Sequence, residues 1–265
     1  LMSTSQDLNY WLGVNMEVGA TNVKVLSLLD QAHTTLFGIP EPTSVSSVPV
    51  EGPAILLSGH DVLDVKRVLD VAQKKNLNVN VYTHGELLPA HSYPELKKFK
   101  NFVGHFGTAW QNQYKDFKDF PGPILMTTNC LMPPRSRYRD RLYTTRCVGY
   151  DDVKHIDAAN EKDVEMMLKQ ALELPGFDQS NMAKWAEVKP HLTGFGHAAI
   201  LSHADTVVSA IKSGALQHIF VIGGCDGTEK TRSYFRDLAE VTPDNSLILT
   251  LGCGKFRLHG LELGD

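Results

Sequence analysis

Five side chains able to bind metals follow five short apolar runs, each near the point where its run ends. His60 follows AILLSG, Glu86 lies in the turn THGE after VNVYT, and Cys130 follows PILMTT. Cys225 follows HIFVIGG and Cys253 follows SLILTLG. Thiolates are soft donors, imidazole is intermediate and carboxylate is hard. This mixture suits a multi-metal group with sulfur and oxygen bridges better than a tetrahedral zinc site, which needs four ligands and usually shows close CxxC pairs.

The elements that position these residues form a doubly wound, Rossmann-like α/β fold with parallel sheets. The five runs lack strict alternation, as strands buried on both faces do. Residues 62–75 carry a helical apolar stripe between the first two runs, which predicts a βαβ unit. A second such unit is predicted over 218–252. Ligands of open α/β sheets bind at the carboxyl ends of the strands, where all five side chains fall.

The chain divides into three predicted parts. Residues 1–49 are a helical remnant, ending near residue 37, and a linker rich in Pro and Ser; 50–190 form a middle α/β domain; and 191–265 form part of a second α/β domain. The last βαβ block has no following helix to cover its sheet, and an open parallel sheet exposes an apolar patch. We therefore expect the chain to be a piece of a longer protein.

Each candidate ligand also has a structural interpretation. A cysteine after an apolar strand is more often a small buried hydrophobe, and Glu86 would suit the first turn of a helix. The imidazole of His60 would suit a hydrogen bond to the next turn. The coincidence of all five favours a site. Cys225 and Cys253 follow glycines where helix N-termini are expected, which would lower their pKa. Bare phosphate-binding loops remain an alternative there.

Other polar residues carry weaker signals. His84 and His91 flank the Glu86 turn and suit proton transfer, although hydrogen-bonded loop histidines are equally compatible. Cys147 follows no comparable strand and is interpreted as structural. The basic run RSRYRDR at 135–141 favours a solvated turn over a docking site for an anionic partner.

Composition excludes several classes of protein. Lys and Arg number 26 and Asp and Glu number 30, a net charge of −4 that argues against nucleic acid as a partner. The sequence contains no apolar run long enough for a membrane span and begins without the pattern of a secretory signal. Its four cysteines are widely spaced, which indicates a reducing compartment and predicts a cytoplasmic protein without a membrane partner.

Long motifs around these residues resemble the hybrid cluster protein family, also called prismane protein or hydroxylamine reductase. The resemblance runs from about residue 10 to residue 265. The motifs that carry it are SGHDVLDVKRVL, VYTHGELLPAHSYPELKKF, VGHFGTAWQNQ, FPGPILMTTNCLMPP, TGFGHAAILS, VIGGCDG and LILTLGCGKFR.

The resemblance implies a hybrid 4Fe-2S-2O iron–sulfur–oxygen cluster and an oxidoreductase that reduces hydroxylamine to ammonia, with nitric oxide as a competing substrate. Its ligands here would be His60, Glu86, Cys130, Cys225 and Cys253, with Cys225 as the persulfide. Electrons would come from a reductase partner through a second iron–sulfur cluster. Glu86 would shift its coordination to admit the small nitrogenous substrate, and His84 is the candidate proton donor.

The chain departs from the family pattern at both ends. The N-terminal cysteines that bind the second cluster are not in this sequence, so that cluster is expected only in the full-length protein. A further Cys ligand and a late Glu and Lys are also outside it. We therefore expect this piece alone to be inactive. Two alternatives stay open: a metal-free fragment or interaction module, and an enzyme that uses a Cys225 persulfide for sulfur transfer or redox chemistry.

Overall fold

The computed structural model describes residues 7–185, 188–229 and 231–263. The chain divides into two units, residues 1–39 and 40–265, which are described separately. The first unit holds one long helix, α1 (Leu8–Phe37), within the predicted helical stretch. The Asp7 carboxylate accepts a hydrogen bond from the Asn9 backbone N–H at 3.1 Å and caps its start, and Gly38, at φ 85°, ends it. Within the described residues, no helix combines the length and apolar character needed to cross a membrane.

The second unit is built on a six-stranded sheet in which every neighbouring pair of strands is parallel. The strand order is β4-β3-β2-β5-β6-β7, so the chain begins at the centre, winds to one edge, and returns to wind to the other. The strands are β2 (Ala54–Ser58), β3 (Asn80–Thr83), β4 (Phe102–His105), β5 (Ile124–Met126), β6 (Leu142–Thr145) and β7 (Lys154–Ile156). This is the doubly wound order, and the predicted fold class is confirmed.

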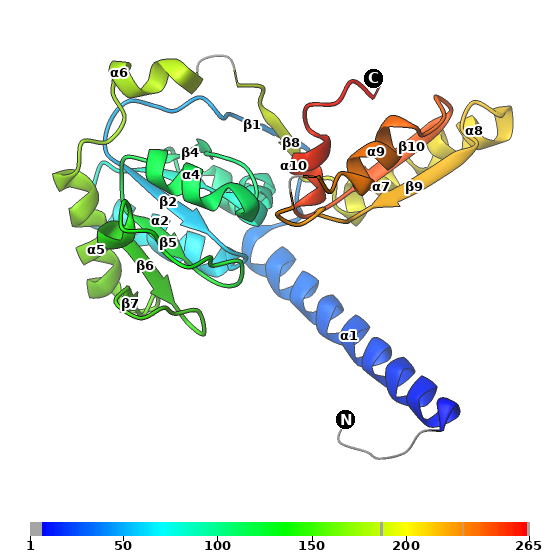
Figure 1. Cartoon of the computed structure of the whole chain (residues 1–265), viewed down its shortest axis with the longest axis horizontal. Coiled ribbons are helices and arrows are strands. Elements are labelled where there is room, and N and C mark those ends of the chain that lie inside the picture. The colour runs from blue at the N-terminus through cyan, green and yellow to red at the C-terminus, as the bar shows by residue number, and fades with distance from the viewer. Residues whose placement is uncertain (1–6, 186–187, 230, 264–265) are drawn as a thin grey trace. The chain divides into compact units, whose positions relative to one another are not determined.

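Helices cover both faces of this sheet (Figure 1). On one face α2 (Val62–Lys74) packs against α5 (Glu161–Glu173), and the apolar stripe of α2 is buried. The other face carries α4 (Gln113–Asp119) and an aromatic core. All five residues of β2 are buried, as its unbroken apolar run predicts. The aromatic core contains Tyr82, Phe106, Phe117, Phe120, Tyr138 and Phe177.

Shorter elements connect and flank these layers. They are η1 (Gly85–Ser92), α3 (Pro94–Lys97), η2 (Trp110–Asn112), η3 (Arg139–Arg141), α6 (Gln179–Met182) and η4 (Ala183–Trp185). The segment 40–53, interpreted as a linker, contains strand β1 (Thr43–Val45). This strand pairs antiparallel with β8 (His191–Thr193), on the far side of the domain boundary expected near residue 190. That boundary stays a prediction.

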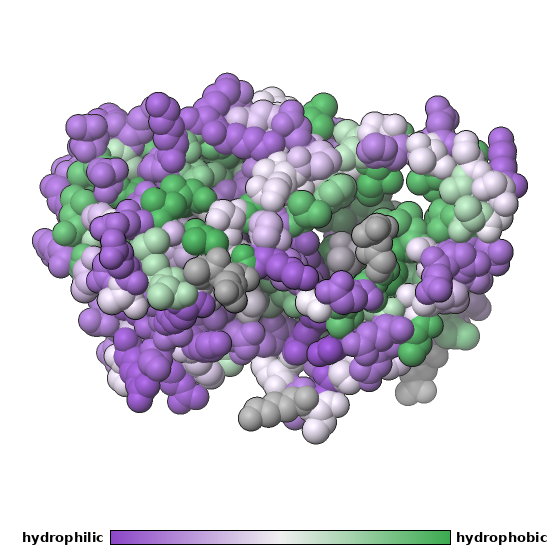
Figure 2. Space-filling view, turned by 90° about the horizontal axis from the view of Figure 1, so that it is seen from above, coloured by the Kyte–Doolittle hydropathy of each residue, from purple (hydrophilic) through white to green (hydrophobic). Residues whose placement is uncertain are grey.

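The remaining strands form a separate parallel pair, β9 (His218–Ile222) and β10 (Ser246–Thr250), connected through α9 (Tyr234–Glu240). The other helices of this region are α7 (His197–Ser202), α8 (Ala204–Ser213) and α10 (Gly254–Leu258). Ile219 and Val221 of β9 keep 50% and 68% of their surface exposed, so apolar side chains of this pair face outward, as expected for an uncovered sheet. Figure 2 shows such apolar side chains on its right, the side on which Figure 1 places β9 and α8.

Gly122 allows the closest backbone approach in the sheet. A Cβ at this position would lie 1.8 Å from the carbonyl oxygen of Ala54 on β2, so neither backbone can yield without moving a strand. Gly122→Ala is therefore expected to lower the free energy of unfolding by about 2 kcal/mol, as overpacking does. Urea unfolding measures this. Gly19→Ala, in open space on α1, is the control and should be neutral or stabilising by about 1 kcal/mol.

Candidate functional site

Three predicted ligands lie at one edge of the six-stranded sheet, because each follows the carboxyl end of a parallel strand. His60 follows β2, Glu86 follows β3 within η1, and Cys130 follows β5. Strands β2 and β5 are neighbours, and the chain leaves them in opposite directions. Ligands of doubly wound sheets bind at such a switch point. The fold therefore places His60 and Cys130 on either side of the crevice.

Glu86 joins the two parallel sheets of the second unit by direct contact. Its Oε2 makes a short hydrogen bond with His60 Nε2, and its Oε1 accepts a hydrogen bond from Cys253 Sγ at 2.8 Å. Cys253 follows β10, so it comes from the other parallel sheet, 167 residues along the chain from Glu86. A histidine, a carboxylate and a thiol thus meet in one continuous row.

The contacts of Glu86 set its charge. The hydrogen bond from His60 lowers the pKa of Glu86 to about 2, against the opposing effect of burial, and the hydrogen bond from Cys253 adds to the lowering. At neutral pH Glu86 is an ionised carboxylate, which accepts hydrogen bonds or binds a cation but donates no proton. Its expected chemistry is therefore that of an anionic ligand.

Cys130 and Cys225 lie within electrostatic reach of this row. Burial raises the pKa of Cys130, and the charges of Glu86 and Cys225 raise it further. The same two cysteines and Glu86 act on Cys253. Cys130 is exposed, Cys225 is half-buried and Cys253 is buried. The structure thus brings together all five predicted residues, although direct contacts join only His60, Glu86 and Cys253.

The predicted cause of thiolate formation is wrong for two of the cysteines. Cys225 enters a loop, and α9 begins only at Tyr234, so no helix N-terminus follows it directly. Cys253 does lie at the N-terminus of α10, as predicted, but its side chain makes no capping hydrogen bond and the helix has five residues. Burial and the neighbouring Glu86 raise the pKa of Cys253 instead of lowering it, because both disfavour a second negative charge. A bound cation would instead lower the pKa of Cys253 and favour its thiolate.

The donor set fits an iron–sulfur group by its chemistry and its place. Three thiols, an imidazole and a carboxylate share one edge, and His60 Nδ1 is buried without a hydrogen-bond partner. In the described part of the chain, no three His, Cys, Asp or Glu side chains form a group arranged to hold a metal ion. The fit therefore rests on donor type and proximity.

His84 and His91 are both buried and hydrogen bonded. His84 Nδ1 lies 3.0 Å from Ser58 Oγ, and its Nε2 lies 3.3 Å from Asp116 Oδ2. His91 Nε2 lies 3.0 Å from Thr83 Oγ1, and burial lowers its pKa to about 3. Both are therefore members of a buried polar network, and proton donation by His84 stays a prediction.

Three residues that hold the cysteine loops escaped the sequence analysis. Gln113 contacts the backbone at Cys130, and both Gln111 and Arg257 donate to the carbonyl oxygen of Cys225. The two glutamines lie in the polar run WQNQ and Arg257 ends the run GCGKFR, and nothing in either run indicates which groups they bind. Cys147 is exposed and is not among the groups that shift the pKa of Glu86, Cys130 or Cys253.

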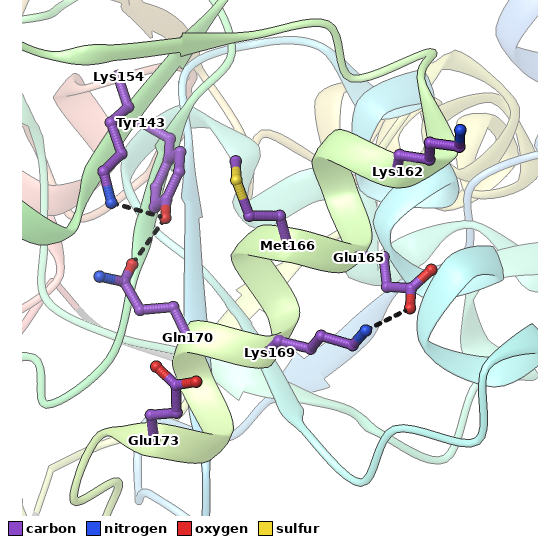
Figure 3. A pocket seen from close by; sticks show the side chains of 8 residues that line it. All are labelled: Tyr143, Lys154, Lys162, Glu165, Met166, Lys169, Gln170 and Glu173. Carbon is purple, nitrogen blue, oxygen red and sulfur yellow. Dashed lines mark hydrogen bonds and ion pairs between the residues drawn. The ribbon is translucent and has the colours of Figure 1, made fainter.

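A pocket of about 580 Å³ lies away from these residues. Figure 3 shows it between α5 and the strands β6 and β7, lined by Tyr143, Lys154, Lys162, Glu165, Met166, Lys169, Gln170 and Glu173. Its lining residues extend along α5, from Lys162 to Glu173, and include Tyr143 of β6 and Lys154 of β7. It contains none of the predicted ligands.

The chain matches one protein family over its whole length. The family model described as "Prismane/CO dehydrogenase family" matches residues 1–265. Hydroxylamine reductases from Thermodesulfovibrio yellowstonii and Zymomonas mobilis subsp. mobilis are 46% and 47% identical over 264 residues, which cover 100% of this chain and 47% of each relative. The hydroxylamine reductase of Moorella thermoacetica is 44% identical, with 60% of its length covered. The chain thus spans about half the length of the first two relatives.

A solved structure shares the fold. The as-isolated Ni-free carbon monoxide dehydrogenase from Thermococcus sp. AM4, produced without CooC maturase, superposes with a TM-score of 0.60 over 84% of this chain and 39% of that one. At 16% identity this similarity concerns the fold alone.

Proposed function

The chain belongs to the Prismane/CO dehydrogenase family, and from this premise we propose that it is part of a hydroxylamine reductase. We propose that His60, Glu86, Cys130, Cys225 and Cys253 hold an iron–sulfur–oxygen hybrid cluster, with Cys225 as the persulfide. The observation that carries the proposal is the row in which Glu86 contacts both His60 and Cys253. Two distant segments meet there through side chains that are typical iron ligands.

The overall reaction would consume two electrons and two protons for each hydroxylamine, with ammonia and water as products. When bound, the cluster supplies electrons that a reductase partner delivers. The residues of this chain would bind the cluster and orient its ligands. In this structure His60 and Cys253 hold the two oxygens of Glu86, and the low pKa of Glu86 makes it an anion. As cluster ligands all three side chains would bind iron instead, with Glu86 as the anionic oxygen ligand. The protons must therefore come from other groups, of which His84 is the proposed one.

Several finer points belong to the same proposal. Nitric oxide is a second candidate substrate. We propose that the chain alone has little turnover, because the remaining ligands and the second cluster would lie in the other half of the full-length protein. The metal-free fragment and the Cys225 sulfur-transfer enzyme remain the rival functions.

Glu86→Gln tests the proposal in the protein that contains this chain. The change keeps the side chain's shape and removes its charge, so we expect iron retention and hydroxylamine consumption to fall by roughly 10- to 100-fold or more. Iron and sulfide content, visible absorption and the rate are measured on protein purified without oxygen. Glu95→Gln is the control, since Glu95 lies on α3 and pairs with Lys98.

Unchanged iron content and rate in Glu86→Gln would exclude Glu86 as a ligand. A colourless protein whose melting temperature ignores iron and chelators would support the metal-free fragment. Turnover that needs Cys225 but no iron would support the sulfur-transfer enzyme.

A further inference from the structure

Both cysteine loops contain two successive residues in the left-handed backbone region. Asn129 and Cys130 have φ values of 46° and 54°, and Asp226 and Gly227 have values of 58° and 67°. For residues with a Cβ this conformation is unfavourable, and it persists only where neighbouring groups hold it. The loops at Cys130 and Cys225 must therefore be held by contacts from elsewhere in the fold.

The Cys130 loop is held by the side chain of Gln113. Its Nε2 donates to the carbonyl oxygen of Cys130 at 2.9 Å, and its Oε1 accepts from the backbone N–H of Met132 at 2.9 Å. Gln113 is the first residue of α4 and is fully buried. Both ends of one amide thus bind the same loop, on either side of Leu131.

The Cys225 loop is held from two directions. Gln111 Nε2 donates to the carbonyl oxygen of Cys225 at 3.1 Å. Arg257 of α10 donates to the same oxygen through Nε at 3.2 Å, and its Nη2 donates to the carbonyl oxygen of Gly227 at 2.6 Å. A carbonyl oxygen has two lone pairs, so both contacts at Cys225 can form together.

Gln111 and Gln113 belong to one continuous turn, in which η2 runs directly into α4. We propose that these two glutamines are positioning residues which fix the separation of Cys130 and Cys225 by binding the backbone carbonyl of each. The proposal rests on the proposed function, in which both cysteines are ligands. The glutamines touch no reacting group themselves. They connect a loop of the six-stranded sheet to a loop of the β9–β10 pair. The positions of both cysteine loops are therefore fixed relative to the same short turn.

The turn itself supplies a matched control. Asn112 lies between the two glutamines and is exposed, and its side chain donates to Thr108 Oγ1 at 2.7 Å. Asn112→Ala therefore alters the same turn and leaves both cysteine carbonyls bonded. The variants to compare with it are Gln113→Met and Gln111→Met, which keep the length of the side chain but cannot donate a hydrogen bond.

Thiol crosslinking of the full chain measures the separation directly. In a Cys147→Ser background, ortho-phenylene bismaleimide is expected to join Cys130 to Cys225, since Cys253 is buried; peptide mass spectrometry identifies the product. Relative to Asn112→Ala, the yield should fall about tenfold in Gln113→Met, which loses both of its bonds to the loop. It should fall about threefold in Gln111→Met, because Arg257 still holds Cys225.

Equal yields in Gln113→Met and Asn112→Ala would overturn the proposal. If Gln113→Met does not fold, the double variant Gln111→Met with Arg257→Met decides instead, and an unchanged yield there has the same consequence. Crosslinking needs no metal, so its outcome is separate from that of Glu86→Gln. If the yield falls as expected in Gln113→Met while iron is unaffected in Glu86→Gln, the proposed function is rejected and the positioning role is kept.

Discussion

Replacing Arg146 with methionine is expected to lower the free energy of unfolding by about 3 kcal/mol, because it leaves a buried carboxylate with a single hydrogen bond from one arginine. Asp64 of α2 is fully buried. Arg146 binds both of its oxygens, at 2.7 and 2.8 Å, and its Nε also lies 2.8 Å from Asp61 Oδ2. After the change only Arg67, at 2.9 Å, remains beside Asp64.

The effect should reach the candidate site. Asp61 caps α2 by accepting a hydrogen bond from the Asp64 N–H at 3.0 Å, and His60 is the residue before it. Arg146 holds both aspartates, so its loss loosens the helix start that carries His60. Amide hydrogen exchange over residues 59–64 should therefore rise more than exchange over β9, which lies in the other sheet.

Urea unfolding measures the stability change in a graded series of variants. Arg67→Met should cost only about 1 kcal/mol, since the bidentate Arg146 contact remains. The double variant should cost more than the sum of the single ones, because Asp64 then loses every cation. Arg236→Met is the control, as that exposed arginine pairs only with Glu240 on its own helix. A loss below 1 kcal/mol in Arg146→Met would show that Asp64 is stabilised by other means.

The centre of the fold is predictable from the sequence, and its edges are not. Strands β2, β3 and β5 lie in apolar runs bounded by turns, and α2 follows its apolar stripe. Strands β4, β6 and β7 escaped prediction because Gly, Thr, Lys and His interrupt their apolar residues, so that none of them forms an apolar run. Their strand conformation comes from pairing with a neighbour already in the sheet, which no local pattern records.

The site also has a part that the sequence predicts and a part that it does not. A βαβ topology brings strand ends together, so the placement of His60, Glu86 and Cys130 follows from topology alone. The contact of Glu86 with Cys253 and the attachment of both cysteine loops to the turn at Gln111 and Gln113 depend on how two sheets pack. The pKa of Cys253 was predicted with the wrong sign because its environment, and not its helix, decides it.

Acid should destabilise the fold well before its carboxylates are protonated, because several histidines are buried in neutral form. Burial lowers the pKa of His91 to about 3. Burial and the nearby His259 and Lys255 lower that of His191 to about 4, and burial holds His105 well below its usual range. An unfolded chain binds protons at these imidazoles below a pH of about 6.5. Stability is therefore complete above that pH and is lost as the pH falls.

Between pH 7 and pH 5, His91 and His191 should each lower the free energy of unfolding by about 2 kcal/mol, because each imidazole binds a proton in the unfolded state but not in the folded state. Urea unfolding at the two pH values measures this loss of about 4 kcal/mol together with the further loss from His105. His91→Phe keeps the ring that stacks on Phe102 at 3.8 Å and should recover about 2 kcal/mol of the total. His218→Phe, at an exposed position, should recover none. Equal pH dependence in the His91 variant and the unaltered chain would mean that His91 is already protonated in the fold. Glu86, with its pKa of about 2, titrates in a lower window and does not contribute above pH 5.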